Sequence, residues 1–233
     1  MKQYRVSIAL IVTVMMALMI AGCEASKQAR GVDEKVTLVD PALLQEGKSG
    51  QALLRYVNPN IDVRRYTKVM LDPVVISTPE GASEADVADL QKLVSNGHIV
   101  MRQELSKDYQ IVDRPGPGTM RIQAGLLNAQ KSKPVRLITS VTPIGAGVSL
   151  VKNFTTGKPT GVGEITGEIK ITDAATGEII GEAVDKRVGG KNPNEVFNTW
   201  ADANHAIEFW AKKLRFFLCT ERRGGNCTPP GNY

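Results

Sequence analysis

The stretch GEITGEIKITDAATGEIIGEAVDKRV, residues 163–188, carries the clearest fold signal in this chain. Apolar side chains recur on both sides of its central turn, at positions Ile165, Ile169, Ile171, Ile179, Ala183 and Val188. The turn closes at Gly177, and glycine readily adopts the positive φ that hairpin turns require. This pattern predicts two antiparallel strands joined by a short turn.

Two long helices are predicted, one before and one after this hairpin. The first is capped by Ser83 and carries a single apolar stripe that ends near Lys107. The second begins at Asn192 and Pro193, which suit a cap and a first helical position. Its apolar stripe is broad enough to cover one face of a sheet. The members of that stripe are Val196, Trp200, Ala203, Ile207, Trp210, Leu214 and Phe217.

Further strands are predicted over residues 66–76, 109–112 and 119–128. Pro73 lacks a backbone N–H, so the first of these strands should contain a bulge or lie at a sheet edge. Runs of strands combined with two helices indicate an α+β domain over residues 61–218. We expect an antiparallel-rich sheet with the two main helices packed on one face.

The N-terminus has the layout of a secretory signal. Two basic residues precede an uncharged run over residues 6–20, and Ala21-Gly22 stands directly before Cys23. The run is shorter than the roughly 20 apolar residues of a membrane span. A cysteine after small residues resembles the lipobox of bacterial lipoproteins, in which this cysteine is acylated and starts the mature chain. We therefore predict a signal peptide over residues 1–22 and lipidation of Cys23; the alternative is an ordinary signal peptide with an incidental cysteine.

The residues after Cys23 bear on where the protein is located. Residue 24 is glutamate, whereas the sorting rule of enteric lipoproteins uses aspartate at this position for retention in the inner membrane. The rule therefore implies the outer membrane, with a lipid-anchored domain on the periplasmic face. Residues 23–60 are predicted to form a tether, polar over residues 27–34, and an arm laid over the domain.

Two cysteines remain once Cys23 is assigned to the lipobox. An even remainder in an exported chain indicates a disulfide, here between Cys219 and Cys227. This bond would pin the Gly- and Pro-containing tail, residues 219–233, to the end of the second helix. The alternative is a buried thiol at Cys219 with Cys227 free in the tail.

Residues 135–151 form an apolar stretch that Pro143, Gly145 and Gly147 interrupt. One interpretation is a buried helix or loop packed on the sheet. The other is a segment that touches a membrane.

The composition argues against a nucleic-acid-binding protein. The chain has 29 basic and 24 acidic side chains; without the two basic residues of the signal peptide, 27 against 24 leaves a charge of +3. The basic residues are scattered along the chain, and aromatic residues make up only 5% of it. A nucleic-acid surface requires a concentrated basic patch and often a platform of aromatic rings.

No catalytic residue, cofactor site or metal site is predicted. Asp202, His205 and Glu208 are spaced three apart and could hold a metal on one helical face, but a solvated polar face explains the spacing equally well. His205 is expected to face solvent, opposite the apolar stripe. Glu182 and Asp185 lie on a predicted strand, where solvated surface is the expected location.

Several pieces of the chain occur in an order that suggests a family. They are Leu38 with residues 41–44, and residues 56–59, 66–74, 143–145, 173–178, 184–185 and 200–214. Together they resemble a family of bacterial envelope lipoproteins known only as a domain of unknown function, over about residues 36–218. No piece is a catalytic motif, so the resemblance implies an envelope lipoprotein with no established activity.

The leading functional hypothesis is a non-enzymatic, outer-membrane-anchored module that binds another envelope protein. One alternative is an oligomeric secretion or pore-assembly subunit, and another is a hydrolase whose carboxylates cannot be paired from the sequence. Trp200 and Trp210 are expected to pack in the core, with a role as partner-binding anchors as the alternative.

Overall fold

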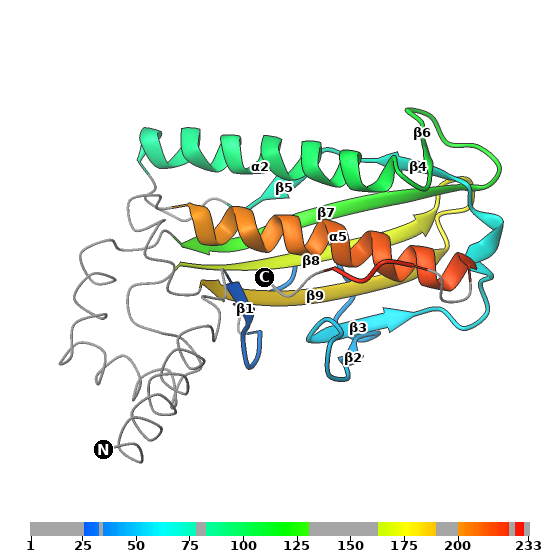
Figure 1. Ribbon diagram of the computed structural model, residues 1–233, viewed down its shortest axis with the longest axis horizontal. Coiled ribbons are helices and arrows are strands. Elements are labelled where there is room, and N and C mark those ends of the chain that lie inside the picture. The colour runs from blue at the N-terminus through cyan, green and yellow to red at the C-terminus, as the bar shows by residue number, and fades with distance from the viewer. Residues whose placement is uncertain are drawn as a thin grey trace, which may run out of the picture.

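The structure is a computed structural model that describes residues 26–32, 35–77, 83–130, 163–189, 200–223 and 227–230. Within these residues it contains one nine-stranded sheet, a short 3-10 helix and two long helices (Figure 1). The elements in chain order are β1 (Ser26–Gln28), β2 (Gln45–Glu46), β3 (Leu54–Val57), η1 (Val63–Arg65), β4 (Lys68–Leu71), β5 (Val75–Ile76), α2 (Glu84–Leu105), β6 (Gln110–Ile111), β7 (Thr119–Gln130), β8 (Glu164–Asp173), β9 (Ile179–Gly189) and α5 (Ala201–Arg223).

The centre of the sheet is the antiparallel trio β7–β8–β9, within the strand order β2-β3-β9-β8-β7-β4-β6. The predicted hairpin is confirmed: Ile169 pairs with Ala183 across β8 and β9, and Gly177 has a φ of 75° in the turn. β1 pairs with β9, and β5 pairs with β7. Only the pairings of β4, β5 and β6 are parallel, so the sheet is mostly antiparallel and the α+β class is confirmed.

The strand predicted over residues 66–76 is divided in two around Pro73. β4 ends at Leu71, β5 begins at Val75, and both pair in parallel with β7. Asp72 still donates its N–H to the carbonyl of Ile122 at 3.0 Å. Proline has no N–H to donate, so the regular pairing stops there and resumes two residues later.

α2 begins and ends close to the predicted positions. The Ser83 hydroxyl accepts the N–H of Asp86 at 3.2 Å, and the Asp86 carboxylate accepts the N–H of Ser83 at 3.3 Å. This reciprocal capping box satisfies two N–H groups that a helix start would otherwise leave unpaired. The helix ends at Leu105, two residues before the predicted end.

α5 packs along β8 and β9, and α2 lies beside α5 (Figure 1). The indole ring of Trp210 lies so close to β8 that a Cβ atom added at Gly167 would come within 2.8 Å of it. Between the helices, the Asn96 amide donates to Asn204 at 2.7 Å. The largest fully buried side chains belong to the core around these contacts and include Tyr66, Leu105, Met120, Ile122, Ile165 and Leu218.

The two faces of the central strands have different covers. Because side chains alternate along a strand, Gly167 faces α5 and its neighbour Glu168 faces the opposite side. We call the side toward α5 the helix face and the opposite side the arm face. Residues 35–46, which we call the arm, cross the arm face. The predicted polar tether is wrong at its start, because Lys27 and Gln28 belong to β1 and pair with β9.

Several predicted features lie outside the described residues. They are the signal peptide with Cys23, the apolar stretch over residues 135–151, and the start of the second helix at Asn192, Pro193 and Val196. In the part of the chain that the structure describes, no helix is long and apolar enough to cross a membrane.

Candidate functional site

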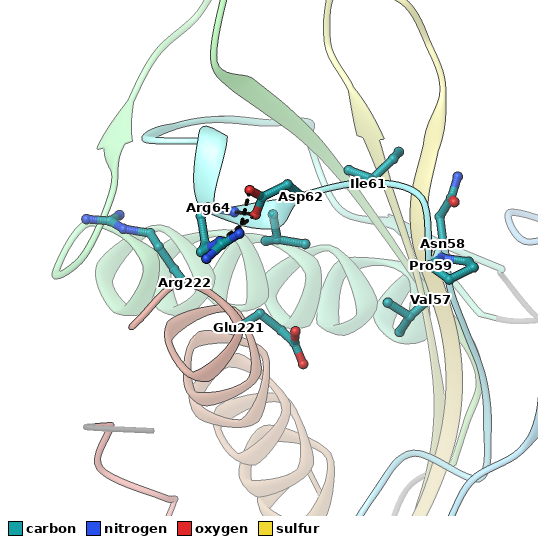
Figure 2. Close-up of a pocket in the computed structure, with 9 residues that line it drawn as sticks. Val57, Asn58, Pro59, Ile61, Asp62, Arg64, Glu221 and Arg222 are labelled. Carbon is teal, nitrogen blue, oxygen red and sulfur yellow. Dashed lines mark hydrogen bonds and ion pairs between the residues drawn. The ribbon is translucent and has the colours of Figure 1, made fainter. Parts of the chain in front are cut away.

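A pocket of about 520 Å³ opens between η1 and the C-terminal end of α5 (Figure 2). It is lined by Val57, Asn58, Pro59, Ile61, Asp62, Val63, Arg64, Glu221 and Arg222. The chain reaches it because β3 ends at Val57 and η1 follows after a turn, in which the Asn58 carboxamide accepts the N–H of Asn60 at 3.0 Å. The pocket therefore joins one edge of the sheet to the last turn of α5.

The charged groups of the pocket are largely paired. Arg64 donates from Nε and a terminal nitrogen to the two oxygens of Asp62, at 2.8 and 2.9 Å. These bonds, together with the Arg64 charge, lower the pKa of the Asp62 carboxyl below its usual value. Arg222 is turned away from the pocket in Figure 2, and its guanidinium donates to the carbonyl of Asp108 at 2.8 Å and lies 5.0 Å from the Tyr109 ring centre.

The lining of this pocket is mixed in polarity. Its apolar members are Val57, Pro59, Ile61 and Val63, and its polar members are Asn58, Asp62, Arg64, Glu221 and Arg222. None of the nine lining residues is a serine, threonine, cysteine or histidine, so the pocket lacks the hydroxyl, thiol or imidazole of the usual nucleophile and base pairs. Its carboxylates are those of Asp62 and Glu221.

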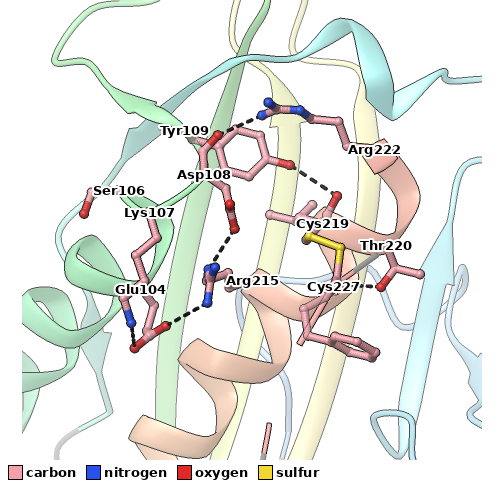
Figure 3. A network of polar contacts seen from close by, with 12 residues as sticks. Glu104, Ser106, Lys107, Asp108, Tyr109, Arg215, Cys219, Thr220, Arg222 and Cys227 are labelled. Carbon is pink, nitrogen blue, oxygen red and sulfur yellow. Dashed lines mark hydrogen bonds and ion pairs between the residues drawn. A yellow bond between two sulfur atoms is a disulfide. The ribbon is translucent and has the colours of Figure 1, made fainter. Parts of the chain in front are cut away.

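A network of polar contacts fixes the α5 wall of the pocket against the end of α2 (Figure 3). Arg215 donates from Nε to the Asp108 carboxylate at 2.7 Å and lies 3.8 Å from Glu104. Glu104 is also 2.6 Å from the ammonium of Lys107. The Tyr109 hydroxyl donates to the carbonyl of Leu218 at 3.3 Å. The contacts of Arg215 and of Tyr109 connect residues more than a hundred positions apart in the chain and hold the last turns of α5 in place.

The structure brings the predicted cysteine pair together at this end of α5. Cys219 and Cys227 are drawn as a disulfide in Figure 3, with their Cα atoms 5.9 Å apart, a normal separation for such a bond. Cys219 is buried on α5, and Cys227 is half-buried in the segment over residues 227–230. The tail is thereby held beside the helix end that lines the pocket.

The expectation that Asp185 is solvated is wrong. Its side chain is 7% exposed on the helix face of β9, where Gln28, Leu53 and Trp210 each donate a hydrogen bond to it. Burial raises the pKa of the Asp185 carboxyl, and the donated hydrogen bonds only partly oppose that effect. β1, the start of β3 and α5 all meet over this carboxylate, which is why it is shielded from water.

The expectation for Glu182 is also wrong, for a different reason. Glu182 lies on the arm face and is 2% exposed. Its carboxylate is 3.0 Å from the ammonium of Lys170 and accepts the N–H of Asp40 at 3.0 Å. Its neighbour across the strands, Glu168, accepts the N–H groups of Thr37 and Leu38 at 3.0 Å each, and the Thr37 hydroxyl at 2.6 Å. The arm thus covers both carboxylates with its own donors.

The possible metal face on α5 finds no support in the described residues. Asp202 accepts the N–H of Gly163 at 2.9 Å, at the start of β8. His205 is half-buried instead of facing solvent as predicted. Across the described ranges, no group of three or more His, Cys, Asp or Glu side chains could hold a metal ion.

Both tryptophans pack against the core, and each indole N–H reaches a carboxylate. Trp200 donates to Asp89 of α2 at 3.2 Å, and Trp210 donates to Asp185 at 2.8 Å.

The pocket between η1 and α5 was not predicted from the sequence. Its residues 57–64 contain turn-forming Asn58-Pro59 and the pair Asp62 and Arg64, which by sequence alone read as an ordinary loop.

Comparison with solved structures returns only loose similarities. A PelC dodecamer from Paraburkholderia phytofirmans is 11% identical with a TM-score of 0.38, over 72% of this chain and 94% of that one. A Helicobacter pylori homolog of neuraminyllactose-binding hemagglutinin is 10% identical with a TM-score of 0.39, over 72% and 90%. A DUF4136 family protein from Bacteroides thetaiotaomicron is 11% identical with a TM-score of 0.32, over 72% and 95%. Similarities this weak assign no function.

The family of this chain is shown by its sequence. No curated protein matches the chain. The sequence model of the family described as protein of unknown function (DUF3313) matches residues 18–214, most of the chain. The predicted resemblance to a domain of unknown function is confirmed, and this protein belongs to the DUF3313 family.

Proposed function

We propose that this protein is a lipoprotein anchored through Cys23 to the outer membrane, with its domain on the periplasmic face. We further propose that it works as a non-enzymatic binding or accessory module for another envelope protein. The observation that carries the proposal is the lipobox-like sequence ending at Cys23, only three residues before the first strand of the domain. A lipidated cysteine there would attach the domain directly to the bilayer.

The state of the buried carboxylates supports a non-enzymatic role. A general acid or base must come within hydrogen-bond reach of a substrate. Glu168, Glu182 and Asp185 instead accept hydrogen bonds from the arm, from β1 and from Trp210. Their geometry is that of groups which hold segments of the chain together.

The pocket between η1 and α5 is the surface we propose for partner binding. Its mixed apolar and charged lining suits a protein side chain, and the Cys219–Cys227 pair lies close to its α5 residues. Trp210 packs against the core and is therefore a poor partner-binding anchor. The pocket is the better candidate for contact with a partner. The scattered basic residues of the chain give no reason to propose a nucleic-acid partner.

We also infer that α2 and α5 form a single layer on the helix face of the sheet. Three contacts support this arrangement: Trp210 against Gly167, Asn96 to Asn204, and the approach of α2 at Gly97 to Ile207. A Cβ atom added at Gly97 would lie 3.6 Å from the Ile207 side chain, an ordinary packing distance. One helical layer would leave the opposite face to the arm.

The anchoring proposal is tested by replacing the cysteine. Wild-type protein should incorporate labelled palmitate and sediment with outer membrane, whereas Cys23→Ser should do neither. Thermal melts of both purified proteins control for folding. Outer-membrane association and palmitate labelling of Cys23→Ser would refute the anchor, and wild-type protein in the inner membrane would refute the sorting assignment.

The partner proposal is tested by crosslinking in cells. A photo-crosslinking residue at Arg64, whose side chain is 68% exposed in the pocket rim, should capture a defined envelope protein. The matched control is Lys92 on α2, whose side chain is 80% exposed and outside the pocket. Capture of the same proteins from both positions, or of none from Arg64, would argue against the pocket as the binding surface.

The disulfide is tested on protein purified from the cell envelope under alkylating conditions. We expect a peptide pair joined through Cys219 and Cys227, because exported thiols meet an oxidising compartment. Two alkylated cysteines without prior reduction would show that the bond does not form in the cell.

A further inference from the structure

β1 fastens the start of the domain to β9 through buried polar contacts. Ser26 has no exposed surface, and Arg187 donates from Nε to its hydroxyl at 2.9 Å and from a terminal nitrogen to its carbonyl. Gln28 donates to Asp185 at 2.6 Å. The Arg187 guanidinium also lies 3.8 Å from the ring centre of Phe209 on α5. The first described residues are therefore part of the rigid domain.

Little chain separates this fastened strand from the proposed anchor. Three residues lead from Cys23 to Ser26, and an extended chain spans at most about 3.5 Å per residue, or roughly 10 Å in all. A lipidated Cys23 would hold the end of β1 close to the bilayer surface. The link is too short to let the domain turn freely.

The direction of β1 shows which end of the domain this is. β1 runs antiparallel to β9, with Ser26 opposite Gly189, so the chain enters from beyond the C-terminal end of β9. Asp202 at the start of α5 lies at the same end, where it accepts the N–H of Gly163. This β1 end is at the left of Figure 1, where α5 begins.

The pocket lies at the other end of the molecule. Its α5 residues, Glu221 and Arg222, are twenty positions beyond the start of the helix at Ala201 and Asp202. At about 1.5 Å per residue, this places the pocket about 30 Å from the β1 end. Val57 agrees with this placement, because it pairs with Gly181 near the start of β9.

We propose that the β1 end of the domain faces the membrane and that the pocket, about 30 Å away, faces the envelope-protein partner in the periplasm. The short link at β1 sets this orientation. The proposal rests on the lipid anchor proposed above and adds which surface faces the bilayer and which faces the partner.

The test compares two positions on one helix. Full-length acylated protein is placed in vesicles of phosphatidylethanolamine and phosphatidylglycerol that carry a quencher on the lipid headgroup. A fluorophore is attached to Glu84→Cys or to Gln103→Cys, both exposed on α2 and about 28 Å apart along it. Glu84 is near the β1 end, as the contact of Asp89 with Trp200 at the start of α5 shows.

We expect several-fold stronger quenching at Glu84→Cys than at Gln103→Cys. A Gly/Ser insert of about eight residues between Ala25 and Ser26 lengthens the link and should make quenching at the two positions similar. Equal quenching without the insert, or an unchanged difference with it, would overturn the orientation. Mass spectrometry of the same sample separates the two proposals: acylated protein with equal quenching refutes the orientation alone, and protein without lipid refutes the anchor and the orientation together.

Discussion

The two faces of β8 and β9 are built from adjacent residues, but the segments that cover them are attached by different interactions. On the helix face, Trp210 packs on Gly167 and the neighbouring isoleucines are covered by α5. On the arm face, Glu168 and Glu182 are covered by a segment whose backbone N–H groups point at their carboxylates. The helix cover is attached mainly by apolar contact, with one bond from Trp210 to Asp185, whereas the arm is attached by a few charge-assisted hydrogen bonds.

This difference determines how far the destabilisation caused by a substitution should extend through the domain. Apolar packing is shared among many atoms of the core, so losing a large ring there weakens the whole domain. The arm is mostly exposed and has Val39 as its buried side chain over residues 35–46. Losing one acceptor beneath it should release the arm locally and leave the core in place.

The largest effect is expected from Trp210→Ala on the helix face. Removing a large aromatic ring from a packed site should cost about 3 kcal/mol of unfolding free energy and lower the melting temperature by several degrees. Trp210→Phe keeps most of the packing but loses the bond to Asp185, so it separates the two contributions. An unchanged melting curve for Trp210→Ala would mean that the helix face does not depend on this ring.

Gly167→Ala should have the next largest effect, on the same face. Its new Cβ would come within 2.8 Å of the Trp210 ring, and relieving such overpacking typically costs 1–3 kcal/mol, here about 2 kcal/mol. The matched control is Gly97→Ala, where the new Cβ meets Ile207 at 3.6 Å. That control should be neutral or stabilising by up to about 1 kcal/mol. Chemical denaturation of both variants measures the contrast, and equal midpoints would contradict it.

Glu168→Ala tests the arm face and should cost less, about 1 kcal/mol, because the arm can hydrate its freed donors. The specific signature is faster hydrogen exchange at the amides of Thr37 and Leu38, with little change in the core. Glu168→Gln keeps one acceptor oxygen and should restore most of the protection. Uniform loss of protection across β7, β8 and β9 would show that the two faces are not separable.

The smallest effect is expected in the pH dependence of stability, through the Asp185 carboxyl that is buried under α5. The pKa of Asp185 is raised, so the folded protein holds this proton more tightly than the unfolded chain, whose carboxyl has the ordinary value of about 3.8. The group therefore favours folding at pH values below about 3.8, and that contribution is lost as pH rises through the raised pKa. Relative to Asp185→Asn, the wild-type melting temperature should fall as pH is raised from about 4 to neutral. A rising difference would mean that the pKa is lowered in the folded state.

Local features of the fold were predictable because their causes are close together in the chain. The capping box joins Ser83 to Asp86, and the hairpin turn places Gly177 at its positive φ. The break at Pro73 follows from one missing N–H. Each of these depends on residues within a few positions of one another, which a pattern in the sequence can reveal.

The candidate site was not predictable in the same way. The pocket is formed by residues 57–64 and by Glu221 and Arg222, which meet only when α5 is docked. The burial of Glu168 is decided by Thr37, 131 positions earlier. Nothing near Glu168 in the sequence distinguishes a carboxylate under an arm from one in water.

Strand alternation in the hairpin, the N-terminal cap of α2 and the order of elements from β4 to α5 were therefore determined by the sequence itself, because backbone conformation responds to neighbouring residues. The cover of each sheet face was decided by tertiary structure. Whether Glu182 or Asp185 meets water depends on which distant segment lies over it. Side-chain burial is a property of the packed chain, since solvent is excluded by contacts between segments far apart in sequence.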